Sequence, residues 1–293
     1  MELFKDKEIA SSTKNLYLKN LTRLNGGEIK SIKFLDDIED IKSKIGKYKP
    51  TTQRSYIISI CSLLKDMKNK KKLYDSYYSL LTQMNADLKV NTSKSESQEK
   101  NWLDYDEIRK IYDSYELPTE KKLKKKDFIN LRNFMIFSLY MLIPPRRNKD
   151  YQIMYISNDM TDKDKNYLDL KEKKFIFNNY KTKKTYQTLE QEIPDELMKV
   201  IHLYLKHSPN AKDLKKKKHN IPFIVDEDGD PLKHINSFTH ILNKLIGKKI
   251  GVSMLRNIYL THKHSDAQEE LEKDTKAMGT STSTATNHYI KKN

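Results

Sequence analysis

Residues 129–150 read INLRNFMIFSLYMLIPPRRNKD, and this stretch decides the fold of the second half of the chain. Apolar side chains cover nearly every face of a helix over 129–143, which predicts a helix buried at the centre of a domain. The two prolines that follow cannot continue that helix, because proline lacks an amide donor. The sequence therefore places Arg146 and Arg147 at a corner between two helices.

Upstream of this helix, the first ninety residues carry four apolar stripes with the three- and four-residue spacing of short helices. The stripes are Leu16, Leu18, Leu21 and Leu24; Leu35, Ile38, Ile41 and Ile45; Tyr56, Ile57, Ile60, Leu63, Leu64 and Met67; and Leu73, Tyr77, Leu80, Leu81, Met84 and Leu88. A small helical domain is therefore expected over residues 1–92. The polar stretch NTSKSESQEK that follows favours an extended linker, placed at 93–101, before a second domain over 102–293.

Downstream of the central helix, three short β-rich runs lie between polar turns, at 167–170, 174–177 and 186–193. They predict a small antiparallel meander. Helical patterns resume after Pro194 and again around residues 238–245. The expected fold is mainly α, with a small antiparallel β meander in the second domain.

The charge of the chain favours a polyanionic partner. Lys and Arg number 56 against 40 Asp and Glu, a formal net charge of +16, and double-stranded DNA would release counterions on binding such a surface. A merely lysine-rich composition without a nucleic-acid partner is the alternative.

Several classes of protein are not indicated. Cys61 is the only cysteine, so neither a disulfide framework nor a thiolate metal site is expected. DEDGD at 226–230 lacks the spacing of a calcium loop and is expected to be a turn, and His262 and His264 lack further metal ligands nearby. No run suits a membrane span and the start lacks an apolar signal core, so a soluble, intracellular protein without metal or cofactor is expected.

The last forty residues carry a tyrosine four residues from the end and an arginine-centred helix upstream of it, which are components of a phosphodiester-cleaving site. Cleaving DNA without a metal requires a nucleophile, cations for the non-bridging oxygens, and an acid for the leaving oxygen. A tyrosine, two arginines and a lysine would suffice, since arginine binds phosphate bidentately and lysine can give up a proton.

Four motifs occur in an order and spacing that resemble the tyrosine recombinase, or phage-integrase-like, family over nearly the whole chain. They are PPRRNKDY at 144–151, NNYKTKKT at 178–185, SMLRNIYLTH at 253–262 and MGTSTSTATNHY at 278–289. The resemblance is to the divergent recombinases of large DNA viruses and virophages. It implies an intracellular location, in the host cytoplasm or nucleus or in a virus factory.

The family's first arginine matches Arg147, with Asp150 as the acid three residues on, and Arg146 is the alternative register. Lys181 matches the hairpin lysine of the family. Lys183 and Lys184 are the alternatives for that position.

The family's second arginine matches Arg256, and its nucleophile matches Tyr289. Ser253 and Thr280 stand where the family has histidines. Neither residue titrates near neutral pH, so the histidine contribution to proton transfer is absent.

The resemblance implies a helical core-binding domain and an α+β catalytic domain that clamp duplex DNA, with self-association as a dimer or tetramer on the DNA. Tyr289 would attack the phosphate, Arg147 and Arg256 would neutralise charge, and a 3′-phosphotyrosyl link would form without metal or ATP. Lys181 would protonate the 5′ oxygen. The alternatives are a type IB topoisomerase, or a DNA-binding protein that has lost cleavage.

Overall fold

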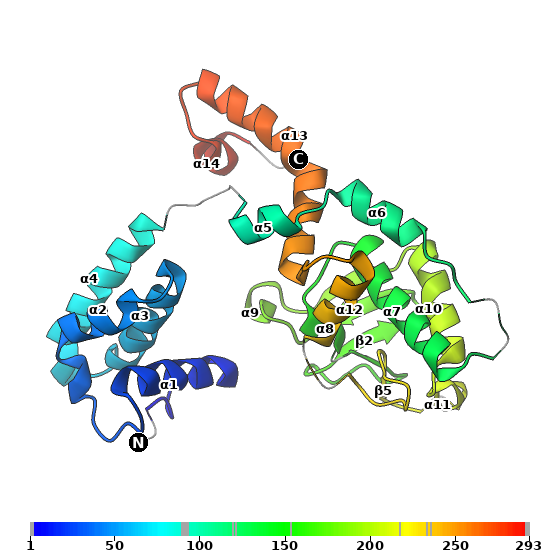
Figure 1. Ribbon diagram of the computed structural model, residues 1–293, viewed down its shortest axis with the longest axis horizontal. Helices are drawn as coiled ribbons and strands as arrows, with labels where there is room; N and C mark the ends of the chain where they lie inside the picture. Colours follow the sequence, from blue (N-terminus) through cyan, green and yellow to red (C-terminus); the bar gives the residue numbers. More distant parts are fainter. Residues whose placement is uncertain are drawn as a thin grey trace. The chain divides into compact units, whose positions relative to one another are not determined.

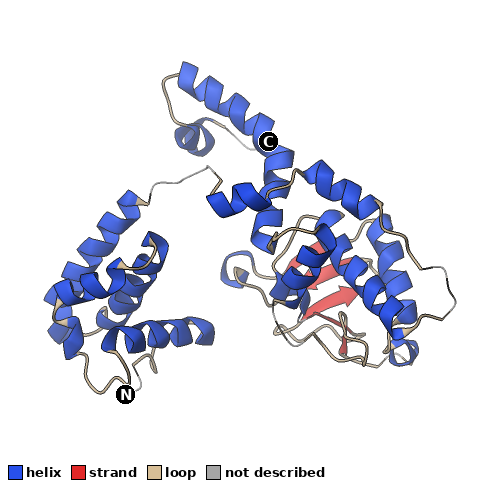
Figure 2. Cartoon of the chain, in the orientation of Figure 1, coloured by secondary structure: helices blue, strands red, loops and turns tan. Residues whose placement is uncertain are grey.

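A computed structural model of the protein describes residues 3–88 and 94–290, apart from positions 119, 121, 153, 217, 233 and 235 and the side chains at 287 and 288. The chain divides into two compact units, Met1–Ser93 and Lys94–Asn293. Figure 2 shows that helix dominates both units and that the described strands all belong to the second. The expected helix-rich fold with a small sheet is confirmed.

The first unit holds the four helices predicted from the apolar stripes. They are α1 (Ser11–Asn25), α2 (Ile38–Gly46), α3 (Pro50–Leu64) and α4 (Lys71–Asp87), with single 3-10 turns at Lys33–Leu35 and Lys68–Lys70. Helix α3 is central and contacts the other three. Its buried Ser59 accepts a hydrogen bond from the amide of Asn20 at 2.9 Å, and Cys61 is a buried free thiol whose pKa burial raises to about 11.

The segment expected to be an extended linker is partly helical. Residues Glu96–Asn101 form α5, which belongs to the second unit, so the prediction of an extended 93–101 is wrong for 96–101. The reason is a capping box: the Ser95 hydroxyl accepts from the Gln98 amide while the Gln98 side chain accepts from Ser95 N–H. Residue 93 of that linker lies outside the described residues.

Helix α7 (Lys125–Met141) is the central helix of the second unit, as predicted. It packs against α6 (Tyr105–Asp113), α10 (Asp195–His207) and α12 (Ser237–Ile246). After the two prolines the chain turns into the short helix α8 (Asn148–Gln152). The predicted corner that carries Arg146 and Arg147 is therefore confirmed.

A five-stranded sheet lies beside α7, in the order β4-β3-β2-β1-β5. Its strands are β1 (Met154–Ile156), β2 (Asn166–Asp169), β3 (Lys174–Phe177), β4 (Leu189–Glu192) and β5 (Ile221–Pro222). β2, β3 and β4 form the predicted antiparallel meander, but β1 is parallel to β2 and β5 is antiparallel to β1. The sheet is therefore mixed, and the sequence did not predict β1 and β5 because they are too short to show alternation.

Part of the run expected to be the third strand of the meander is helical. Lys183–Tyr186 forms the one-turn helix α9, which ends at Gln187 with φ 55° before β4 begins.

A short helix α11 (Ala211–Lys215) follows α10. The segment 226–230 is a turn, as expected.

The chain ends in a long helix, α13 (Val252–Ala277), of 26 residues. Its first turns bury Val252, Leu255 and Ile258, whereas Thr275 is the only buried residue of the helix after Leu260. Figure 1 shows α13 projecting from the body of the second unit, with α14 (Thr282–Thr284) lying against its far end. We call residues 261–290 the distal arm.

Candidate functional site

A cavity of about 630 Å³ in the second unit gathers three segments that lie far apart in the sequence. The corner after α7 contributes Arg146, Arg147 and Asp150; the β3–β4 connection and β4 contribute Tyr180, Thr182, Tyr186, Leu189, Glu190, Gln191 and Glu192; and α13 contributes Arg256. Both arginines that the sequence assigns to one site therefore line one cavity. We call it the arginine cavity.

The three arginines of the cavity have different environments. Arg146 donates to the buried carboxylate of Asp150 at 3.2 Å, and its guanidinium carbon lies 3.6 Å from the ring centre of Phe177. Burial raises the pKa of Asp150, while the charges of Arg146 and Arg147 oppose that rise. Arg147 and Arg256 have no ion-pair partner within the described part of the chain, so they are free to bind an anion.

The different environments give Arg146 and Arg147 different expected roles. Arg146 stabilises the fold, whereas Arg147 is available to bind a ligand. Arg146→Ala is expected to lower the free energy of unfolding by about 2–4 kcal/mol, because it leaves the buried Asp150 carboxylate without its cation. The matched variant Arg147→Ala should change it by less than about 0.5 kcal/mol. Urea denaturation measures both free energies of unfolding. Equal losses for the two variants would contradict the distinct roles given to Arg146 and Arg147.

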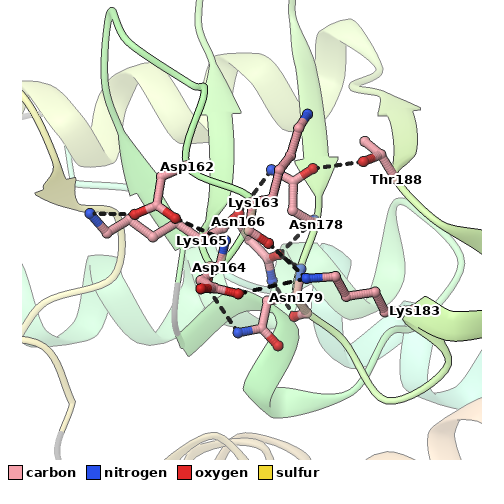
Figure 3. A network of polar contacts seen from close by, with 9 residues as sticks. All are labelled: Asp162, Lys163, Asp164, Lys165, Asn166, Asn178, Asn179, Lys183 and Thr188. Carbon is pink, nitrogen blue, oxygen red and sulfur yellow. Dashed lines mark hydrogen bonds and ion pairs between the residues drawn. The ribbon is translucent and has the colours of Figure 1, made fainter.

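Asn166 ties the arginine corner to the hairpin that forms the opposite wall of the cavity. This fully buried side chain donates to Asp150 O at 2.8 Å and to Asn179 O at 3.0 Å. Its oxygen accepts from the backbone N–H groups of Asn178 and Asn179. Figure 3 shows Asn166 with its partners Asn178 and Asn179. All the hydrogen-bonding capacity of one amide is thus used to hold two walls together.

The three candidate lysines lie on the hairpin, with different surroundings. Lys183 is engaged in the loop: its ammonium donates to Lys163 O at 3.0 Å and lies 3.7 Å from Asp164 (Figure 3). Lys181 is exposed and stands between two residues that line the arginine cavity, although it is not itself a lining residue. Lys184 is exposed as well. Unlike Lys183, Lys181 makes neither a side-chain hydrogen bond nor an ion pair within the described residues.

Helix α13 carries Ser253 and Arg256 on one face at its start, and Thr280 follows its far end. Ser253 is exposed and lies one turn before Arg256. From Arg256 to Ala277 the helix rises by about 31 Å at ~1.5 Å per residue. Thr280 is therefore far from the arginine cavity, in a turn where its N–H donates to Thr275 O at 2.9 Å.

The proposed nucleophile also lies on the distal arm. Tyr289 is 59% exposed and ends a π-helical turn, Ala285–Tyr289, that packs against α14. It is not among the residues that line the arginine cavity. The structure therefore brings Arg147 and Arg256 together, with Lys181 at the margin, and leaves Ser253, Thr280 and Tyr289 out of the lining of the cavity.

The arginine cavity contains two tyrosines that the sequence did not single out. Tyr180 donates its hydroxyl to Gln187 O at 2.7 Å and so closes the hairpin loop. Tyr186 is 60% exposed and lines the cavity together with both free arginines. A lone aromatic in a lysine-rich loop has no periodic signal, so only the fold could reveal its position.

No described helix is long and apolar enough to cross a membrane. Within the described residues, no three His, Cys, Asp or Glu side chains are placed to hold a metal ion. His262 instead stacks on Tyr105, with 4.6 Å between ring centres.

Neither a scan against protein-family models nor a search of curated proteins finds a match to this sequence. What the chain does must therefore be inferred from its residues and their geometry.

Proposed function

We propose that the protein is a DNA strand transferase of the tyrosine recombinase kind, which cleaves and rejoins duplex DNA. The observation that carries the proposal is the convergence of unpaired Arg147 and Arg256 on one cavity. Two guanidinium groups can hold the non-bridging oxygens of a phosphodiester and neutralise the charge that develops there. The net charge of +16 supplies affinity for the DNA backbone.

In the proposed reaction the Tyr289 oxygen attacks the phosphorus atom and the bond to the 5′ oxygen breaks. The phenol gives up its proton to solvent, and Lys181 supplies a proton to the leaving 5′ oxygen. The product is a 3′-phosphotyrosyl link, and attack by the 5′ hydroxyl of a DNA strand reverses the step. In this proposal the Ser253 hydroxyl, one turn before Arg256 on α13, donates a hydrogen bond to the same phosphate.

The position of the distal arm bears on how Tyr289 reaches the phosphate. Tyr289 follows the far end of α13 and is not among the residues that line the arginine cavity of its own chain. We propose that Tyr289 of one copy acts at the arginine cavity of another copy bound to the same DNA. Self-association on DNA is then part of the reaction.

The same separation supports a second candidate, a DNA-binding protein that no longer cleaves. In that case the arginine cavity would hold a phosphate without a nucleophile. Covalent adduct formation decides between the two candidates.

Strand cleavage is expected to proceed unchanged in excess EDTA, because two arginines and a lysine supply the charge that a metal would otherwise provide. Adduct yield on nicked duplex DNA, with and without chelator, measures this. Loss of the activity in EDTA and recovery with a divalent ion would indicate a metal-dependent nuclease instead.

A further inference from the structure

A second cavity, of about 870 Å³, lies between α5 and the connection from α12 to α13. Four lysines line it: Lys100 from α5, Lys244 from the last turn of α12, and Lys248 and Lys249 from the connection. Glu96 is the one carboxylate among its described lining residues. We call this site the lysine cleft.

Two hydrogen bonds hold the walls of the lysine cleft together. The side-chain oxygen of Asn101 accepts from the backbone N–H of Lys249 at 3.2 Å. The ammonium of Lys248 donates to Trp102 O at 3.4 Å. These bonds fasten α5 to a segment nearly 150 residues later in the chain, so the fold itself brings the positive charges together.

The charges in the cleft are not neutralised. Within the described residues, the side chains of Lys100, Lys244 and Lys249 make neither an ion pair nor a hydrogen bond. Lysine near a helix C-terminus can simply complement the helix dipole, but Lys249 lies beyond the end of α12. Like charges gathered in this way repel one another, and an incoming anion relieves the repulsion.

We infer that the lysine cleft binds the phosphodiester backbone of duplex DNA at a position separate from the arginine cavity. The inference rests on the proposed function for the identity of its ligand. Described lining residues include no aromatic side chain to stack a base, which argues against a nucleotide pocket. Lysine acts on phosphate as a point charge, which suits contacts that do not depend on base sequence. The cleft would hold flanking DNA while the arginine cavity holds the phosphate that reacts.

The test compares two double variants of the full chain that remove the same charge. Lys244→Gln with Lys249→Gln alters the lysine cleft, whereas Lys199→Gln with Lys206→Gln alters α10, where both lysines are exposed and unpaired within the described residues. Binding of a duplex of about 30 base pairs is followed by fluorescence anisotropy from about 50 to 300 mM salt. The cleft variant should lower the slope of log affinity against log salt by about 1.8, and the affinity at about 150 mM salt more than tenfold.

The α10 variant should change the slope by less than about half a unit. Equal changes in both variants would overturn the inference. Adduct formation is measured separately with Tyr289 intact: an adduct together with equal slopes refutes the lysine cleft alone. A selective loss of slope without any adduct supports the cleft and refutes strand transfer.

Discussion

Replacing Arg256 by alanine is expected to lower the rate of covalent adduct formation by about a thousandfold or more, because the phosphodiester loses one of its two cations. Arg147→Ala should cause a loss of the same size. DNA affinity should fall by at most about tenfold, since a single phosphate contact among many is removed. Single-turnover assays on a pool of nicked duplexes with randomised sequence beside the nick measure the rate.

Two matched variants sharpen that result. Ser253→Ala, one turn earlier on the same face of α13, should slow adduct formation only about tenfold to a hundredfold, as expected for a lost neutral donor. Arg256→Lys keeps the charge but loses the planar fork, so its rate should lie between those of Arg256→Ala and the unaltered chain. Equal losses for Ser253→Ala and Arg256→Ala would contradict the role given to the arginine.

A mixture of Arg256→Ala and Tyr289→Phe chains is expected to form the adduct, although neither variant forms it alone. The reason is that Tyr289, on the distal arm, does not line the arginine cavity of its own chain. In the mixture, the intact tyrosine of the arginine variant can meet the intact arginines of the tyrosine variant. The adduct should therefore be attached only to the Arg256→Ala chain, which a mass difference or an affinity tag identifies.

The yield from the mixture should be a substantial fraction of the unaltered yield, because some neighbouring pairs combine the two intact halves. An inactive mixture, alongside active unaltered protein, would mean that the arm bends back and that Tyr289 acts within one chain. A mixture of Arg256→Ala with Arg147→Ala serves as a control. It should form no adduct, because no chain in that mixture carries both arginines in one cavity.

The centre of the fold could be predicted from sequence because its signals are strong and local. Helix α7 is apolar on nearly all faces and is followed by two prolines that end it. The corner at Arg146 and Arg147 could therefore be predicted from the sequence. Strands β1 and β5, of three and two residues, offered no alternation to detect. Helix α5 did have a signal, the Ser95 and Gln98 capping box, which a polar composition obscured.

The site could be predicted only as far as motif spacing in the sequence identified its residues. Motif spacing brought Arg147 and Arg256 into one hypothesis, and the fold places both in one cavity. The direction of the distal arm could not be foreseen, because it depends on which residues of α13 find tertiary partners, and few after Leu260 do. Tyr186 and Asn166 act through tertiary position alone, so no pattern in the sequence marks them.

The most direct test of the central claim is peptide mapping after the protein is incubated with the pool of nicked duplexes and digested with nuclease and trypsin. We predict a nucleotide attached to AMGTSTSTATNHYIK, residues 277–291, which contains Tyr289. The exposed tyrosine that does line the arginine cavity, Tyr186, lies in TYQTLEQEIPDELMK, residues 185–199, so attachments to the two peptides have different masses. Attachment to the Tyr186 peptide, or no attachment to any tyrosine while the protein still binds DNA, would contradict the account.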